Sequence, residues 1–141
     1  MNLRGCFEKG LLKRMSKNKE LAKRTMELAI SDLGEAEASY AMESYVWATV
    51  QAYTSMLNFA RAVLFLEGIR EKSHFCTVEY LRRNYINHYG DLIEKLDVLR
   101  RERHMTLYDS REHVTAEKVK ERIDWCKEFH EKTKGLIETG K

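Results

Sequence analysis

Residues 39–68, SYAMESYVWATVQAYTSMLNFARAVLFLEG, decide the fold of this chain. Apolar side chains recur there at steps of three and four residues, which is the pattern of an amphipathic helix. Gly68 suits the left-handed position that ends such a helix. At 1.5 Å per residue the helix would be about 40 Å long. A rod of that length does not fit a compact orthogonal fold, so the stretch predicts a helical bundle.

The flanking sequence predicts further helices and no strand. Proline is absent and glycine occurs only seven times, which favours long helices and excludes a loop-rich sandwich or barrel. We therefore expect an all-α, antiparallel up-and-down bundle of four to five helices over residues 17–138, preceded by a basic N-terminal arm at 1–16 with one short helical turn. Besides 39–68, the expected helices are 18–37 (capped by Ser16 or Asn18), 75–86, 91–107 and one that Thr115 caps.

Length and composition are those of one globular domain. The chain has 141 residues and a mass of 16.7 kDa, of which 43% are hydrophobic and 33% charged, so it is not intrinsically disordered. The net charge of +3 comes from 25 basic and 22 acidic residues. This charge is too small for a protein that coats DNA.

Cysteine usage and hydropathy favour a cytoplasmic location. Cys6, Cys76 and Cys126 are odd in number and widely spaced, which predicts reduced thiols used as small hydrophobes and no disulfide. The N-terminus has no apolar signal region. The most apolar stretch, 53–66, is interrupted by polar residues and is too short to span a membrane.

The sequence predicts neither a cofactor nor a metal. No glycine-rich phosphate loop of either common type is present. The histidines do not form an H-E-x-x-H motif, and His74 with Cys76 would supply only two ligands.

The window LRRERHMTLYD at 99–109 holds the strongest candidate site. Arg103 is in register with the apolar stripe that Leu99 continues, and a buried arginine needs a carboxylate, phosphate or carbonyl partner. His104 and Tyr108 are four residues apart and would be neighbours on a helix. With Arg100, Arg101 and Arg111 nearby, the window predicts a phosphate-binding corner. The alternative is that these cations only complement the negative end of a helix dipole.

The long helix at 39–68 admits two interpretations. Its aromatic residues could stack on nucleic acid, but their helical spacing favours the core or a subunit interface. The surplus of apolar side chains predicts a homodimer. Arg61 is expected to pair with a carboxylate or to reach solvent. His74 is expected to cap or pack a helix rather than to act in catalysis.

Two segments together resemble the HEPN domain, whose name stands for higher eukaryote and prokaryote nucleotide-binding. They are YTSMLNFARAVLFLEGIREKSH at 53–74 and LRRERHMTLY at 99–108, and the resemblance covers most of 17–137. It implies a dimeric bundle of four or five antiparallel helices. Many members are metal-independent RNases, often toxins, with an R-x4–6-H motif. Others are partners of a small nucleotidyltransferase.

The resemblance implies roles for individual residues. Arg103 matches the motif arginine, and Tyr108 stands where the family has histidine. A phenol with a pKa of about 10 is a poor general base, although it can donate a proton or orient a phosphate. His104 is the alternative acid or base. The catalytic candidates are thus Arg103, Tyr108 and His104, and the RNA or phosphate ligands are Arg100, Arg101 and Arg111. An RNase and a non-catalytic protein that holds a nucleotidyltransferase or another subunit both remain open.

Overall fold

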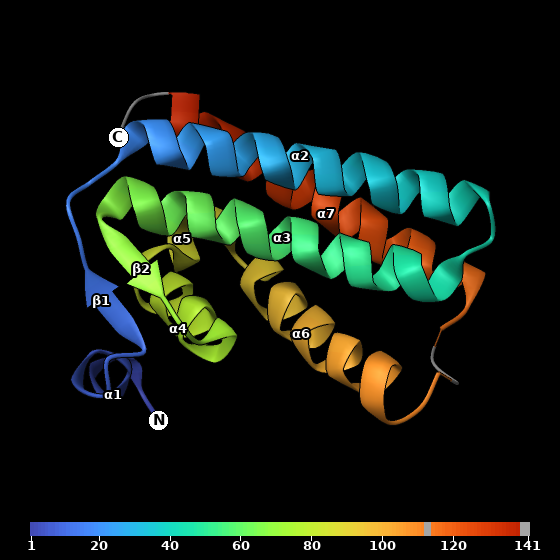
Figure 1. The fold of residues 1–141 in the computed structure, drawn as a ribbon, viewed down its shortest axis with the longest axis horizontal. Coiled ribbons are helices and arrows are strands. Elements are labelled where there is room, and N and C mark those ends of the chain that lie inside the picture. The colour runs from blue at the N-terminus through green and yellow to red at the C-terminus, as the bar shows by residue number, and fades with distance from the viewer. Residues whose placement is uncertain (112–113, 139–141) are drawn as a thin grey trace.

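The computed structural model describes residues 1–111 and 114–138, and these form an all-α bundle (Figure 1). In chain order the elements are α1 (Leu3–Glu8), β1 (Leu12–Arg14), α2 (Lys19–Ala41), α3 (Tyr45–Glu67), β2 (Ile69–Glu71), α4 (His74–Asn84), α5 (Ile86–Tyr89), α6 (Leu92–Tyr108) and α7 (Ala116–Glu138). The predicted fold class is confirmed. Within the described ranges, no helix is both long enough and apolar enough to cross a membrane.

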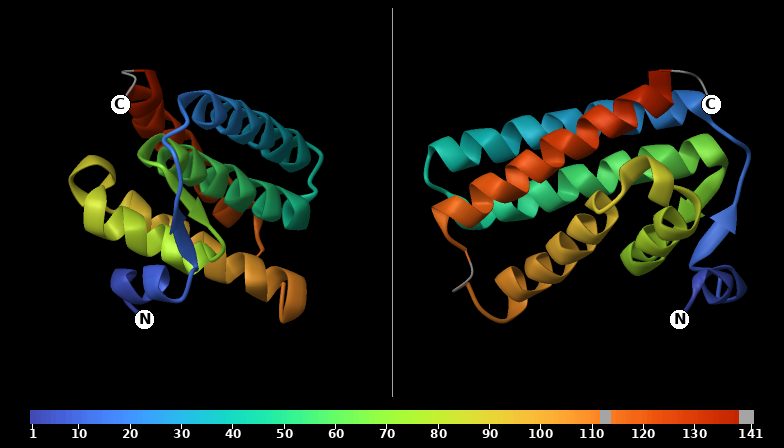
Figure 2. Two further views of the ribbon diagram at one scale, coloured as in Figure 1. Left: turned by 60° about the vertical axis from the view of Figure 1, so that its left-hand side comes forward. Right: turned by 180° about the vertical axis from the view of Figure 1, so that it is seen from behind.

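Helices α2, α3 and α7 run side by side, and α4 and α6 lie on the other side of α3 (Figures 1 and 2). Helix α3 is therefore central, and most of its apolar residues are buried by neighbours in the same chain, although Trp47 near its start is 57% exposed. Phe59 packs near Phe129 of α7, and Leu99 of α6 is also fully buried. This packing accounts for much of the apolar surface from which a homodimer was expected. The dimer itself stays a prediction.

The break between the helices expected at 18–37 and 39–68 lies a few residues later than predicted. Helix α2 continues to Ala41, and α3 begins only at Tyr45. Between them Glu43 has a φ of 60°, a left-handed conformation that ends α2 and reverses the chain. Met42, for which the helical spacing favoured the core or a subunit interface, lies in this turn and is 80% exposed, so it is not part of the core. No glycine or proline marks the break, and the apolar spacing continues across it. The position of the break therefore has no local signal in the sequence.

The N-terminal segment adds a small sheet that the sequence did not predict. Strand β1 pairs antiparallel with β2, with Lys13 opposite Arg70. Leu12 is buried against the core. Such short strands carry too few residues to show a period of two, which is why the prediction of no strand was wrong.

A disulfide joins Cys6 of α1 to Cys76 of α4, with the two Cα atoms 5.8 Å apart. The prediction that all three cysteines are free thiols is therefore wrong. It treated distance along the chain as distance in space, whereas the β1–β2 pair brings α1 against α4. Cys126 alone is the buried free thiol that was expected. The cytoplasmic location was predicted in part from the absence of a disulfide. That argument no longer holds, and the location stays a prediction.

Gly68 links α3 to β2 and should not tolerate a side chain. Its φ is +77°, and an added Cβ would lie 2.6 Å from the carbonyl oxygen of Met15. We expect Gly68→Ala to lower the free energy of unfolding by about 2 kcal/mol or more, measured by urea denaturation. The matched control is Gly34→Ala, because an added Cβ there meets no atom within 4 Å. Its helical position should make that variant more stable by about 0.5–1 kcal/mol. Equal effects of the two substitutions would contradict this account.

Candidate functional site

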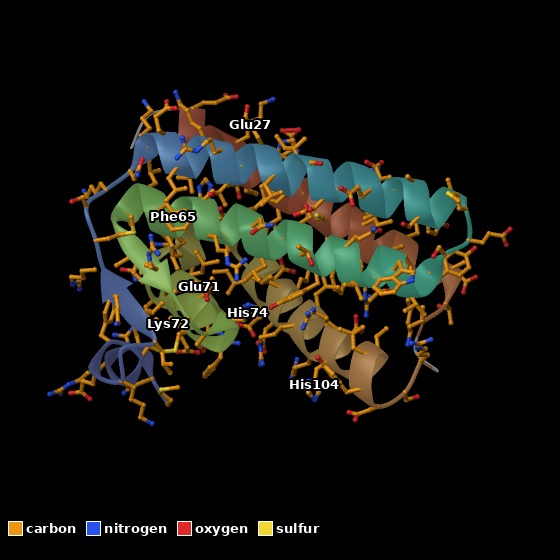
Figure 3. All side chains as sticks on the ribbon, in the orientation of Figure 1. Glu27, Phe65, Glu71, Lys72, His74 and His104 are labelled. Carbon is orange, nitrogen blue, oxygen red and sulfur yellow. A yellow bond between two sulfur atoms is a disulfide. The ribbon has the colours of Figure 1, made fainter. Side chains whose placement is uncertain are left out.

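A pocket of about 730 Å³ lies between α3, the start of α4 and the C-terminal half of α6. We call it the α3–α4–α6 pocket. Its walls are Tyr53 from α3, residues 72–75 from the β2–α4 junction, and five residues between 100 and 105 from α6. Figure 3 shows Lys72 and His74 on the same side of α3 as His104. The expected phosphate-binding corner therefore forms one wall of a larger site.

The pocket is electropositive. Lys72, Arg100, Arg101 and Arg103 line it, and none of the described lining residues is acidic. Just outside it, Asp97 accepts a hydrogen bond from Arg100 Nε at 2.8 Å and lies 3.7 Å from Arg101 Nε. Neither Arg103 nor Lys72 has a carboxylate partner within residues 1–111 and 114–138. Two cations of the pocket are thus left without a counter-ion from the described protein.

Arg103 is half-buried beside an aromatic ring. Its guanidinium carbon lies 5.8 Å from the centre of the Tyr53 ring, a cation–π arrangement. The sequence led us to expect a carboxylate, phosphate or carbonyl partner for this arginine. The described protein instead provides a ring face, which leaves the planar set of N–H donors unpaired.

Beneath the pocket a chain of hydrogen bonds runs from Tyr53 to Glu71. The Tyr53 hydroxyl is 2.8 Å from His74 Nδ1, and Arg61 Nη2 is 3.2 Å from His74 Nε2. Arg61 Nε then donates to Glu71 Oε1 at 2.5 Å. The pairing of Arg61 with a carboxylate is confirmed. The helix cap of α4 is Ser73, whose hydroxyl accepts from the Cys76 amide, so His74 is free to face the pocket.

Burial sets the protonation of both ring side chains. Burial lowers the pKa of His74 below its usual 6.5; the Glu71 charge opposes this, and the charge of Arg61 adds to it. Burial also raises the pKa of Tyr53 above 10, against the lowering effect of the nearby Arg103 charge. At neutral pH the site therefore holds a neutral imidazole and a protonated phenol.

The predicted site residues separate into two groups. Arg100, Arg101, Arg103 and His104 come together in the pocket. Tyr108 does not line it: this residue ends α6 and is 67% exposed, and its ring centre lies 4.9 Å from that of His104. Arg111 lies beyond α6, and its Nε is 3.4 Å from the Thr106 carbonyl oxygen. Tyr108 lies one helical turn beyond His104, outside the residues that line the pocket.

The sequence analysis did not identify Tyr53 and Lys72 as site residues, and it expected His74 to cap or pack a helix. Tyr53 was assigned to the core, and it is indeed only 2% exposed. A signal was available, because a buried tyrosine hydroxyl needs a hydrogen-bond partner. The K-S-H run after the expected helix end at Gly68 offered one, but only the fold shows that His74 reaches Tyr53.

Comparisons with known proteins identify the family of this chain. No curated protein gives a significant match to the chain. A family model does match, namely that of the HEPN domain, over residues 22–136. The match includes α3, α4 and α6 and so the whole lining of the pocket, and it supports a general nucleotide- or RNA-related role. Since the match extends over most of its length, this chain belongs to the HEPN domain family.

Proposed function

We propose that the α3–α4–α6 pocket binds a phosphate group of RNA or of a nucleotide. The observation that supports this best is the half-buried Arg103, which lines the pocket without a carboxylate partner among the described residues. Lys72 also lines the pocket and adds a second positive charge that has no carboxylate partner among the described residues. A cation in that position is stabilised by an anion, and a guanidinium matches the geometry of phosphate oxygens. The family's general nucleotide- or RNA-related role favours a phosphate as this anion.

Two further features of the pocket support a phosphate ligand that carries a base. Helix α4 begins in the pocket wall, and the free N–H groups and positive dipole of a helix start attract negative charge. Phe75 supplies aromatic surface in the pocket wall, on which a base can stack. The Arg100 guanidinium carbon of α6 lies 5.8 Å from the centre of the Phe75 ring of α4, so a cation for the phosphate and an aromatic ring for the base lie close together in the pocket.

The same residues can support metal-independent RNA cleavage. In this reaction the ribose 2′-hydroxyl attacks the adjacent phosphorus, and the bond to the 5′-oxygen of the next nucleotide breaks. Arg103 would stabilise the charge on the phosphorane oxygens. His104 would accept the 2′ proton, because an imidazole exchanges protons near neutral pH and this one has no hydrogen bond to the described protein. The departing 5′-oxygen takes up a proton from water, and the protonated His104 returns its proton to the solvent, so the products are a 2′,3′-cyclic phosphate and a free 5′-hydroxyl.

The test uses the full-length wild type with two ligands. A fluorescent single-stranded RNA and adenosine monophosphate distinguish RNA from a free nucleotide as the ligand, by anisotropy and calorimetry. We expect saturable binding that weakens as salt rises, because phosphate contacts release counter-ions. Cleavage is followed in EDTA, with analysis of the product ends. RNA that is bound but stays intact would favour the non-catalytic protein that holds a nucleotidyltransferase or another subunit. The proposal is overturned if the protein binds neither the RNA nor adenosine monophosphate.

A further inference from the structure

Both ring nitrogens of His74 have a partner. One of these partners, Arg61, determines which group donates and which accepts in every hydrogen bond from Glu71 to Tyr53. Arg61 Nη2 lies 3.2 Å from Nε2. A guanidinium has only N–H donors and stays protonated, so it cannot accept a hydrogen bond. Nε2 must therefore be the accepting nitrogen, since a proton on it would place two donors face to face. Arg61 is held in this position by its ion pair with Glu71.

The tautomer of His74 then determines what the Tyr53 hydroxyl can do. A neutral imidazole with an accepting Nε2 carries its proton on Nδ1. That N–H donates to the Tyr53 oxygen, 2.8 Å away. The phenol proton is consequently not used in this contact. No other acceptor for it is found among residues 1–111 and 114–138, although Tyr53 lines the pocket.

We propose that Tyr53 is a ligand of the bound phosphate: the Glu71–Arg61–His74 chain holds the imidazole as the Nδ1–H tautomer and so directs the Tyr53 O–H into the α3–α4–α6 pocket as a hydrogen-bond donor. This inference rests on the phosphate site proposed above. Arg61 and Glu71 do not line that pocket. They act on the phosphate through His74 and are positioning residues.

The surroundings of Tyr53 fit the role of a donor. Burial keeps the phenol protonated at neutral pH, so it offers a proton and not a negative charge. Arg103 lies against the same ring, with 5.8 Å from its guanidinium carbon to the ring centre, so one oxyanion can meet both groups. The buried side chain of Glu71, only 7% exposed, holds the far end of the chain in place.

The first test is Tyr53→Phe, which removes the hydroxyl and keeps the ring against Arg103. Loss of one hydrogen bond to a charged ligand should weaken binding of a short fluorescent single-stranded RNA about tenfold. The matched control is Arg24→Ala, because Arg24 is an exposed cation of α2 outside the pocket. We expect that variant to bind like the wild type.

The second test measures the tautomer without any ligand. Imidazole ¹⁵N spectra of the wild type should assign the proton of His74 to Nδ1. Removing Arg61 alone would leave the Glu71 carboxylate buried and unpaired, so Arg61→Met is combined with Glu71→Gln. In this double variant the proton is free to move to Nε2, and the Tyr53 hydroxyl can donate to Nδ1. RNA binding should fall by the factor seen for Tyr53→Phe, and adding Tyr53→Phe should cause no further loss.

The outcomes separate this inference from the proposed function. A wild type that does not bind RNA overturns the phosphate site and the Tyr53 ligand with it. Binding that is lost in Arg103→Ala but unchanged in Tyr53→Phe overturns the Tyr53 ligand alone. A proton found on His74 Nε2 in the wild type overturns the proposed donor and acceptor roles of His74 and Tyr53, whatever the binding data show. Circular dichroism of each variant confirms that the bundle is folded.

Discussion

Arg103→Ala should slow RNA cleavage about 10²–10³-fold and remove most RNA binding while the bundle stays folded. The size of the effect follows from the position of this arginine, which lines the pocket without a carboxylate partner among the described residues. Its donors are therefore available to phosphate oxygens, and most of all to the extra charge that develops on the phosphorane. Its side chain is only half-buried, so its removal leaves no large cavity. Single-turnover cleavage in EDTA and RNA anisotropy measure the two effects.

Tyr108→Phe is the matched comparison for Arg103→Ala. The family pattern places Tyr108 in the histidine position, whereas the structure places it outside the pocket lining and largely in solvent. We expect this variant to bind and cut RNA like the wild type. Cleavage that survives Arg103→Ala would point to a contaminating nuclease or to a different site. A loss in Tyr108→Phe as large as in Arg103→Ala would show that Tyr108 belongs to the active site after all.

Cys6→Ser should lower the free energy of unfolding by about 4 kcal/mol. The disulfide closes a loop of 70 residues, so the unfolded chain without it gains considerable conformational freedom. It also ties α1 to α4, the helix whose start carries His74. The measurement is urea denaturation under oxidising conditions.

The wild type in a thiol reductant provides the control for Cys6→Ser. Reduction should bring its stability down to that of the variant, and the variant itself should not respond to the reductant. A thiol count in denaturant should give one free thiol in the oxidised wild type, because Cys126 is not bonded. Three free thiols, or a Cys6→Ser variant as stable as the wild type, would show that the disulfide does not form in solution.

Features set by neighbours along the chain could be predicted from the sequence. The helix expected at 91–107 is α6, Leu92–Tyr108, because its apolar spacing and Gly90 before it are local signals. Thr115 caps α7 as expected, with its hydroxyl accepting from the Lys118 amide. The register of Arg103 with Leu99 also follows from helical geometry alone. These local signals suffice for the fold class and for one wall of the pocket.

Features that join distant segments could not be predicted in this way. The partners in the disulfide are 70 residues apart, and Tyr53 and His74 are separated by 21. Spacing along a helix says which side chains share a face, but not which other helix that face meets. The position of Tyr108 outside the pocket lining could not be predicted for the same reason, since only the crossing of α6 over α4 and α3 decides which of its turns open into the pocket.

The sequence by itself determined an all-α bundle and an arginine-rich end of α6, because periodicity, caps and the lack of proline act over a few residues. The tertiary structure alone decided that Arg103 has no carboxylate partner among the described residues, that His74 faces Tyr53, and that Cys6 meets Cys76. These contacts depend on how helices pack, and packing is set by the free energy of the whole core. The chemistry of the site therefore comes from a tertiary arrangement of residues that, taken singly, are ordinary members of helices.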